Sequence, residues 1–455
     1  MIEQPRNFTA ELAVIGSGMA GFAASVFAVN RKIATALTGN SGAMAYTTGY
    51  LDLLGRVDGS MTAVADPWQA LEHLRETQPD HPLSRIAVAD IRRGFDEFTS
   101  FLGDSGITYG HAGERNITAL TPIGTLKQTL CVPDTMAAGP RAFAAKAACV
   151  IVDFEGLKGF SGREVVTNLG DRWPGLVTQR IAFPDMPRGE IYAEVMARAL
   201  EVPATREKLA VALQGVAGQA RVIGLPAILG IHRPDQVHAD LQKLTGLVIF
   251  EIPTMPPSVP GVRLRELLEQ ALPMKGVTLI PQHKVARLGF DVDGATLDLR
   301  DSFGPIRIRA RAVILATGRF LSGGLEAHPD RIREHLLDLP VSQPAGRADW
   351  YRERYTDARG HAIHRAGIEI DADSRPLGQN GRPVSERLFA AGVIVAHQDW
   401  IRSRSGAGIA IATAYQAVAA AERYLRESSG RLASRRGRSW GGNESGAVGT
   451  TIVGR

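Results

Sequence analysis

The sequence predicts a mixed α/β fold in which a parallel sheet with a β-meander is interrupted by a large α/β insertion. Three observations lead to this prediction. Residues 12–39 read as a buried strand, a glycine-rich turn, a helix and a second strand. Residues 276–318 read as short alternating strands that end in one buried strand, and a glycine-containing strand and helix follow only after residue 385. Together these patterns favour one discontinuous α/β domain.

Size and composition exclude several classes of protein. The 455 residues suffice for about two to four domains, and 44% hydrophobic and 22% charged residues are ordinary for a globular protein. No apolar run reaches the roughly 18–20 residues of a membrane-spanning helix, and the N-terminus lacks the order of a signal peptide. We therefore expect a cytoplasmic protein, or one held at a membrane by a partner. Cys131 and Cys149 alone cannot form an iron–sulfur cluster, so redox chemistry would need an organic cofactor.

The net charge of +5 does not indicate a nucleic-acid-binding protein, because the basic residues are spread among acidic ones along the chain. The one dense basic cluster, Arg431, Arg435, Arg436 and Arg438, lies in a Gly/Ser-rich segment. We predict that residues 428–455 form a disordered tail. Nucleic acid is not an expected partner.

The order of the patterns predicts the domain boundaries. Residues 1–60, 251–320 and 385–427 are expected to form a Rossmann-like nucleotide-binding domain, which ends in an alanine-rich helix to about Leu425. Residues 61–250 form the α/β insertion, and residues 321–384 belong to a second or cap domain. A proline-rich segment precedes a helix that Ser258 is predicted to cap and that runs to about Leu272.

The glycine-rich turn is the first motif that carries chemistry. The G-x-G-x-x-G pattern follows a strand and opens a helix, as a dinucleotide fingerprint requires. Its glycines allow a tight turn, close approach to a phosphate and close packing of helix on strand, while the helix N-terminus donates N–H groups. The predicted phosphate-binding residues are Gly16, Ser17, Gly18, Ala20 and Gly21.

The acidic residue that usually binds the adenosine ribose is missing. It is expected about 20 residues after the fingerprint, where the sequence reads Thr38-Gly39-Asn40-Ser41. Either Asn40 or Ser41 hydrogen-bonds a ribose weakly, or the ligand is a mononucleotide without adenosine.

The late return of the chain favours a flavin over a nicotinamide cofactor. Flavoproteins lead the chain back to the nucleotide site twice, the second time with a glycine-containing strand and a helix N-terminus beside the flavin. This chain has the same order. The further residues predicted to contact the flavin are Ala316, Thr317, Gly318, Gly392, Gly406, Ala407 and Gly408.

Several segments resemble FAD-type flavoprotein oxidoreductases and, more closely, the B subunit of anaerobic glycerol-3-phosphate dehydrogenase. They are IGSGMAGFAA, TTGYLDLLG, TPIGTLKQT, IPTMPPSVPGVRL, AVILATGRFLSGGL and ADWYRERY, and the resemblance covers about residues 11–425. The proline-rich segment and TGRFLSGGL are the more specific, because general flavoproteins do not carry them. The chain departs from the pattern in IRSRSGAGIAIATAY, where Arg402 and Arg404 replace the small residues expected there.

The resemblance implies a flavoprotein subunit that works with a catalytic A subunit and an iron–sulfur C subunit, peripheral at the inner membrane. Such a complex oxidises sn-glycerol 3-phosphate to dihydroxyacetone phosphate and passes the electrons to quinone. The implied cofactor is FMN, and the fingerprint keeps FAD as the alternative. A stand-alone flavin-dependent oxidoreductase of another small hydroxy compound and a non-catalytic scaffold subunit are the alternative functions. We expect little glycerol 3-phosphate oxidation by the isolated chain.

Further candidates lie in loops, and each has a structural alternative. Thr47, Thr48 and Gly49 follow the second strand and are predicted either to hydrogen-bond the flavin ring or to form an exposed turn. His397 and Asp399 are candidates for a base or for a group that orients the flavin, or they are structural. No metal site is predicted.

Two features point to a ligand or to a partner. Arg263 lies in the first turn of the proline-segment helix, where the helix dipole disfavours a cation. It is predicted to bind a substrate or flavin phosphate, or to lie on a solvated face. Trp350, Tyr351 and Tyr355 form an aromatic cluster among arginines that is either a subunit interface or part of a core.

Overall fold

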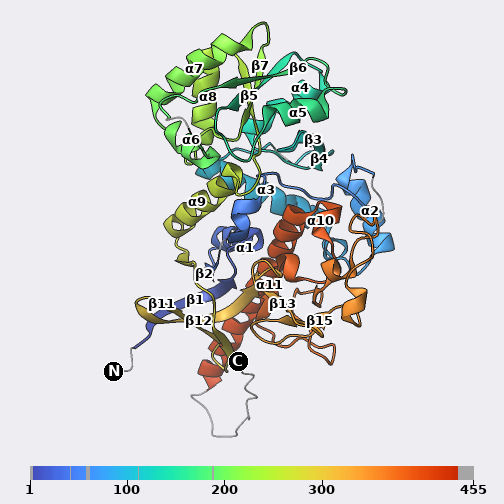
Figure 1. Cartoon of the computed structure of the whole chain (residues 1–455). Helices are drawn as coiled ribbons and strands as arrows, with labels where there is room; N and C mark the ends of the chain where they lie inside the picture. The colour runs from blue at the N-terminus through green and yellow to red at the C-terminus, as the bar shows by residue number, and fades with distance from the viewer. Residues whose placement is uncertain (1–3, 41, 58–61, 111, 187–188, 439–455) are drawn as a thin grey trace.

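A seven-stranded sheet forms the domain that the sequence predicts to be the nucleotide-binding domain in the computed structural model, which describes residues 4–40, 42–57, 62–110, 112–186 and 189–438 (Figure 1). Strands β9, β2, β1, β12 and β17 are parallel, and β10, β11 and β12 form the antiparallel meander. The predicted mixed α/β fold with a parallel sheet is confirmed. The strands are β1 (Arg6–Ile15), β2 (Thr35–Gly39), β9 (Thr278–Pro281), β10 (Arg287–Phe290), β11 (Ala295–Asp301), β12 (Gly304–Leu315) and β17 (Leu388–Ala390).

The two faces of this sheet bury different cores because side chains alternate along each strand. On β1, Leu12 and Val14 pack among the helices α1 (Met19–Asn30), α3 (Val88–Ser105) and α11 (Gly406–Arg438). Ala13 and Ile15 pack on the opposite face. That face is covered by a segment with four short strands, β13 (Leu325–Ala327), β14 (Ile332–Glu334), β15 (Val341–Ser342) and β16 (Gly367–Ile368).

The insertion is a second parallel sheet with its own core, and it forms the upper lobe in Figure 1. Its strands lie in the order β6-β5-β7-β8. The elements are β5 (Cys149–Phe154), β6 (Leu176–Ile181), β7 (Val222–Pro226), β8 (Val248–Ile252), α4 (Ala138–Ala144), α5 (Gly162–Leu169), α6 (Ala193–Ala199), α7 (Pro203–Ala217) and α8 (Pro234–Thr245).

The helices before the insertion sheet pack on the binding domain. Trp68 of α2 (Pro67–Thr77) and Phe95 and Phe98 of α3 share one core with α1 and α11. The predicted insertion begins at residue 61 and therefore includes both helices. An amphipathic pattern indicates that one face of a helix is buried, but it does not indicate which part of the protein covers that face. The hairpin of β3 (Ile117–Leu120) and β4 (Leu126–Thr129) then leads into the insertion.

Helix α9 (Val259–Met274) returns the chain to the binding domain, and its start lies beside the segment after β2. Ser258 occupies the N-cap position as predicted, but its side chain does not cap the helix. Its hydroxyl donates instead to the carbonyl oxygen of Thr47 at 2.6 Å. This bond fixes the loop that carries Thr47 and Thr48.

The last helix is longer than predicted, because α11 continues to Arg438 instead of ending near Leu425. Arg311 on β12 donates to the carbonyl oxygen of Leu425 and to the hydroxyl of Ser428, each at 2.7 Å, which ties the extra turn to the sheet. Helix α11 therefore includes residues 428–438 of the segment that is expected to be disordered, and residues 439–455 lie outside the described part of the chain.

The remaining described elements are short helices in the connecting loops. No helix in the described ranges is both long enough and apolar enough to cross a membrane. The short helices are η1 (Gly42–Tyr46), η2 (Pro82–Arg85), η3 (Asp134–Met136), η4 (Arg347–Asp349), η5 (Ala362–Arg365), η6 (Gly392–Ile394) and α10 (Trp400–Ser403).

Candidate functional site

A cavity of about 740 Å³ lies where β1, β2 and β12 end and where α1 and α11 begin. Ligands of open α/β sheets bind at this carboxyl edge of the strands. The volume is within the range of about 300–1,000 Å³ of small-molecule sites. The predicted residues that line it are Gly16, Ser17, Gly18, Ala20, Asn40, Thr47, Thr48, Ala316, Thr317, Gly318, Gly392, Asp399, Gly406 and Ala407.

The fingerprint glycines differ in what surrounds them. Gly16 has φ +117°, and a Cβ there would overlap the carbonyl oxygen of Ala316. A Cβ on Gly21 would overlap the carbonyl oxygen of Gly16, so Gly21 serves helix–turn packing and does not line the cavity. A Cβ on Gly18 would meet nothing within 4 Å. The backbone at Gly18 therefore leaves space for a ligand.

Two buried hydroxyls fit a phosphate-bearing ligand in this cavity. Among the described residues, Ser17 Oγ and Thr317 Oγ1 are buried without a hydrogen-bond partner, and both residues line the cavity. A buried polar atom without a partner costs free energy, and a ligand with phosphate oxygens removes that cost. Ser17 also lies directly before the N-terminus of α1, where anions are favoured.

The second return of the chain reaches the same cavity. Gly392 has φ +82° and donates its N–H to Thr413 Oγ1 at 2.7 Å, which joins the loop after β17 to α11. Gly406 and Ala407 bring the N-terminus of α11 to the cavity. Gly408 does not line it, because a Cβ there would lie 2.7 Å from the carbonyl oxygen of Leu53, where the helix packs closely.

The segment after β2 supplies one edge of the cavity. Asn40 lines it at the end of β2, and Ser41 lies outside the described residues. The hydroxyl of Thr47 accepts the N–H of Gly49 at 3.3 Å. Gly49 itself does not line the cavity: a Cβ there would lie 2.7 Å from Cβ of Pro260. Its role in the structure is the packing of α9.

Of the two predicted catalytic residues, only Asp399 lines the cavity. His397 has φ +65°, and its Nε2 lies 2.5 Å from Glu369 Oε1, outside the lining. A different histidine, His364 of η5, lines the cavity, and its Nδ1 lies 3.3 Å from Asp399 Oδ2. In the structure Asp399 therefore pairs with His364, and His397 lies outside the cavity.

The charge of Asp399 is maintained by its neighbours. Burial acts to raise its pKa, but hydrogen bonds from His364 and from the N–H of Arg402 hold the pKa below its ordinary value. An ionised Asp399 only accepts, so the hydrogen bond requires a proton on His364 Nδ1. With the proton on Nδ1, Nε2 is the ring nitrogen that can accept a proton, which is the arrangement of a general base.

Arg319 holds the two loops that carry this pair. It donates to the carbonyl oxygens of His364 and, at 3.1 Å, of Gln398. Its guanidinium is buried, and burial lowers the pKa of Arg319 to about 10. The residue therefore remains a cation at neutral pH and positions His364 relative to Asp399.

A second charged cluster lines another part of the cavity. Lys127 of β4 forms an ion pair with Asp52, with Nζ 2.6 Å from Oδ2. Tyr50 and Arg404 also line the cavity. Burial and the nearby Asp52 carboxylate raise the pKa of Tyr50, which therefore stays neutral. This part of the site combines cations with one buried carboxylate.

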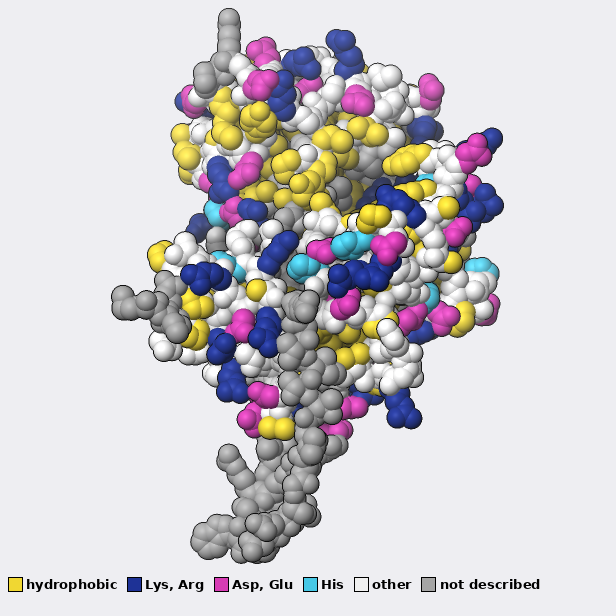
Figure 2. Space-filling view, turned by 60° about the horizontal axis from the view of Figure 1, so that its bottom comes forward, with side chains coloured by type: hydrophobic (Ala, Val, Ile, Leu, Met, Phe, Trp, Pro, Cys, Tyr) yellow, Lys and Arg dark blue, Asp and Glu magenta, His cyan; other side chains and the backbone are white. Residues whose placement is uncertain are grey.

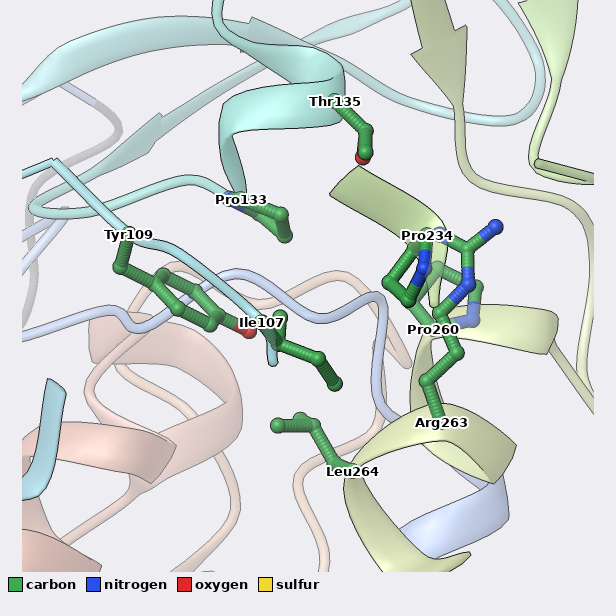
Figure 3. A pocket seen from close by; sticks show the side chains of 8 residues that line it. All are labelled: Ile107, Tyr109, Pro133, Thr135, Pro234, Pro260, Arg263 and Leu264. Atoms are coloured by element: carbon green, nitrogen blue, oxygen red, sulfur yellow. The ribbon is translucent and has the colours of Figure 1, made fainter. Parts of the chain in front are cut away.

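Arg263 does not reach this cavity, which corrects the predicted phosphate-binding role. Its guanidinium forms a buried bidentate pair with Glu251 of β8, with N–O distances of 2.6 and 2.7 Å. The space beside it is a pocket of about 10 Å³, where its side chain extends from α9 alongside Pro234 and Pro260 (Figure 3). Such a volume is about that of one water. The anion that Arg263 faces is internal.

The predicted aromatic cluster divides between core and surface. Trp350 is 2% exposed and belongs to the core on the second face of the sheet. Tyr351 and Tyr355 are 59% and 87% exposed.

We therefore expect Trp350→Ala to lower the free energy of unfolding by about 3 kcal/mol, because it removes buried surface and leaves a cavity. Urea unfolding measures this loss. Unchanged stability of the variant would contradict the core assignment.

Large hydrophobic side chains surround the cavity. Figure 2 shows a face of the molecule on which hydrophobic side chains gather near a hollowed middle, with Lys, Arg and His side chains beside them. The residues that both line the cavity and are exposed hydrophobics are Tyr46, Phe320, Leu321, Trp400 and Ile401.

Sequence reasoning missed His364, Lys127, Asp52 and Arg319 as site residues. Asp52, Lys127 and Arg319 do lie in segments TTGYLDLLG, TPIGTLKQT and TGRFLSGGL that carry the resemblance. No sequence pattern indicates His364 as a site residue, because it is one histidine in an irregular segment.

The sequence matches known flavoproteins. The profile of the FAD binding domain family matches residues 11–409. Proteins named as the B subunit of anaerobic glycerol-3-phosphate dehydrogenase are 31% identical in Vibrio cholerae serotype O1, over 90% of this chain and 95% of that protein, and 29% identical in Yersinia pestis, over 92% and 98%. The solved structure of 3-ketosteroid delta1-dehydrogenase from Sterolibacterium denitrificans covers 92% of this chain and 100% of its own, at 10% identity and a TM-score of 0.42. The chain therefore belongs to the FAD binding domain family and, within it, to the proteins named as the B subunit of anaerobic glycerol-3-phosphate dehydrogenase.

Proposed function

We propose that this chain is the flavin-carrying subunit of a dehydrogenase that oxidises sn-glycerol 3-phosphate to dihydroxyacetone phosphate. The observation that supports this most is the cavity that joins the phosphate-binding turn at Gly16 and Gly18 to the His364–Asp399 pair. The relatives are named as subunits of a glycerol-3-phosphate dehydrogenase. We extend the substrate and the role as a subunit to this chain.

The proposed partners are a catalytic A subunit and an iron–sulfur C subunit that passes electrons to quinone. In this proposal the partners hold the chain at the cytoplasmic side of the inner membrane. Co-purification of the tagged chain with both subunits tests the assembly. Recovery of the chain free of both from cells that express all three would contradict it.

The flavin would be held by the turn before α1, by Ser17 and Thr317, and by the N-terminus of α11. When bound, a flavin supplies a two-electron acceptor. The resemblance implies FMN and the family profile implies FAD. The visible spectrum of the purified chain, with chromatography of the flavin released by heat, distinguishes FMN, FAD and no flavin. A folded chain without flavin would contradict the proposal.

His364 is the proposed base. Oxidation of a secondary alcohol to a ketone removes two electrons and two protons, and the hydroxyl proton needs an acceptor. His364 accepts this proton at Nε2, while Asp399 accepts the hydrogen bond from Nδ1 and stabilises the imidazolium that forms. Asp399 is a positioning residue in this scheme, because it acts through His364.

We expect His364→Asn to lower kcat for glycerol 3-phosphate by about 10²-fold or more in the purified complex, with flavin content unchanged. The measurement is steady-state reduction of an artificial electron acceptor. His397→Asn is the matched control, because His397 contacts Glu369 and does not line the cavity. Equal losses of kcat in the two variants would rule out His364 as the base.

A further inference from the structure

We infer that the cavity of this chain contains its own subsite for the phosphate group of a small phosphate ester, formed by Lys127 and Arg404 around Asp52. The inference rests on the proposed function for the substrate class. It also extends that function, because the resemblance places substrate oxidation in the A subunit. Here the chain itself binds the ester.

Arg404 is held at this place against a conformational cost. It has φ +49°, in the left-handed region that side chains other than glycine rarely adopt. Its Cβ lies where a Cβ on Gly55 would come within 3.0 Å, so Gly55 makes room for it. An arginine at a backbone position suited to glycine, where it also lines a cavity, points to a function for the guanidinium.

The Arg404 guanidinium also lacks a full set of protein partners. Its Nη1 lies 3.4 Å from the carbonyl oxygen of Leu126, the residue before Lys127. Within the described ranges, no carboxylate forms an ion pair with it. Burial and the charge of Arg56 lower the pKa of Arg404 by more than the Asp52 carboxylate raises it, so its surroundings disfavour the cation. A partly buried cation in such a position is stabilised by an anion from outside the chain.

The local charges match a phosphate monoester. Lys127 and Arg404 line the cavity with two positive charges, and Asp52 carries at most one negative charge. Asp52 is 8% exposed, its Oδ1 is buried without a partner among the described residues, and burial raises its pKa. This excess of positive charge complements a phosphate monoester, which carries about −1.5 to −2.

The subsite lies next to the proposed base in the fold. Helix α10 connects Asp399 directly to Arg404, and both residues line the cavity with His364 and Lys127. A small ester with its phosphate on the two cations therefore has its hydroxyl end within the same cavity as the His364–Asp399 pair. The phosphate-binding turn at α1 is formed by separate residues, which leaves it to the flavin.

The same phosphate chemistry has two sources, a free ester or the phosphate of the flavin itself. The test uses the flavin-loaded chain and isothermal titration with glycerol 3-phosphate, inorganic phosphate and glycerol. We expect both phosphates to bind and glycerol to bind at least tenfold more weakly. Absence of flavin from the wild type contradicts the proposed function. Flavin-loaded protein that does not bind phosphate overturns the subsite alone.

The variants are Lys127→Met and Arg404→Gly, with Lys243→Met on the exposed face of α8 as the matched control. We expect each of the first two to weaken phosphate binding about ten- to a hundredfold, since each removes a charge-assisted contact. Arg404→Gly is expected to keep or raise the melting temperature, because glycine suits the left-handed backbone.

Flavin content separates the two sources of phosphate. Wild-type flavin content with weakened phosphate binding in both variants supports the subsite. Loss of flavin from either variant assigns the cations to the flavin phosphate and overturns the inference. Phosphate affinity that equals that of Lys243→Met overturns it as well.

Discussion

Gly18→Val is expected to give a folded protein without flavin. Gly18 has φ −86° and ψ −172°, which a valine adopts without strain, and an added Cβ meets nothing within 4 Å. The space it would enter belongs to the cavity beside the N-terminus of α1. A valine there occupies the position at which the backbone would otherwise approach a phosphate. Binding is lost while the fold is kept.

The measurement is the ratio of flavin absorbance to protein absorbance, taken with circular dichroism and thermal unfolding. Gly21→Val is the matched comparison, because it is the same change three residues later in the same motif. Its Cβ would overlap the carbonyl oxygen of Gly16, so this variant is expected to lose the fold with the flavin. Full flavin occupancy in folded Gly18→Val would show that the phosphate binds elsewhere.

The parts of the site that the sequence predicted are those in which one short segment determines the geometry. The turn from Gly16 to Gly21 depends on a strand, a helix start and glycines, all within a few residues. The same holds for Gly318, which follows a buried strand, and for Gly392. Their approach to one cavity follows from the parallel order of β1, β12 and β17.

The charged residues of the site could not be predicted in this way, because they come from distant segments. His364 lies on η5 and Lys127 on β4, and each reaches the cavity only through the packing of the whole chain. His397 is a candidate on the sequence because it lies close to Asp399 along the chain. Its left-handed backbone turns the ring towards Glu369, and no local pattern indicates that turn.

For the fold, the sequence patterns indicate where strands and helices lie, but they do not indicate which elements pack against each other. Helix α3 lies within the predicted bounds of the insertion, yet its Phe95 and Phe98 pack with α1 and α11. An amphipathic pattern shows that a face is buried, but the burial partner depends on tertiary structure.

Arg263 shows how sound local reasoning can lead to an incorrect ligand. A cation in the first turn of a helix does face an anion here, but the anion is Glu251 of the insertion sheet. Arg263 Nε also donates to the carbonyl oxygen of Gly230 at 2.7 Å. The pair therefore connects α9, which returns to the binding domain, with the insertion.

We expect Arg263→Met to lower the free energy of unfolding by about 3–5 kcal/mol at pH 7, because it leaves a fully buried carboxylate without its partner. Burial alone raises the pKa of Glu251, and the charge and hydrogen bonds of Arg263 bring it below its ordinary value of 4.5. The stabilisation is therefore present above pH about 4.5 and lost as the pH falls through the lower pKa of the folded state.

Urea unfolding of wild type and variant at several pH values between 7 and 4 measures this effect. The difference between them is expected to shrink as the pH falls, because Glu251 of the variant takes up a proton and no longer buries a charge. The double variant Glu251→Leu, Arg263→Met removes both charges and is expected to recover much of the loss, since well-packed apolar residues replace buried ion pairs at little cost. A double variant as unstable as Arg263→Met would show that Arg263 stabilises the junction through packing and its bond to Gly230, and that its charge contributes little.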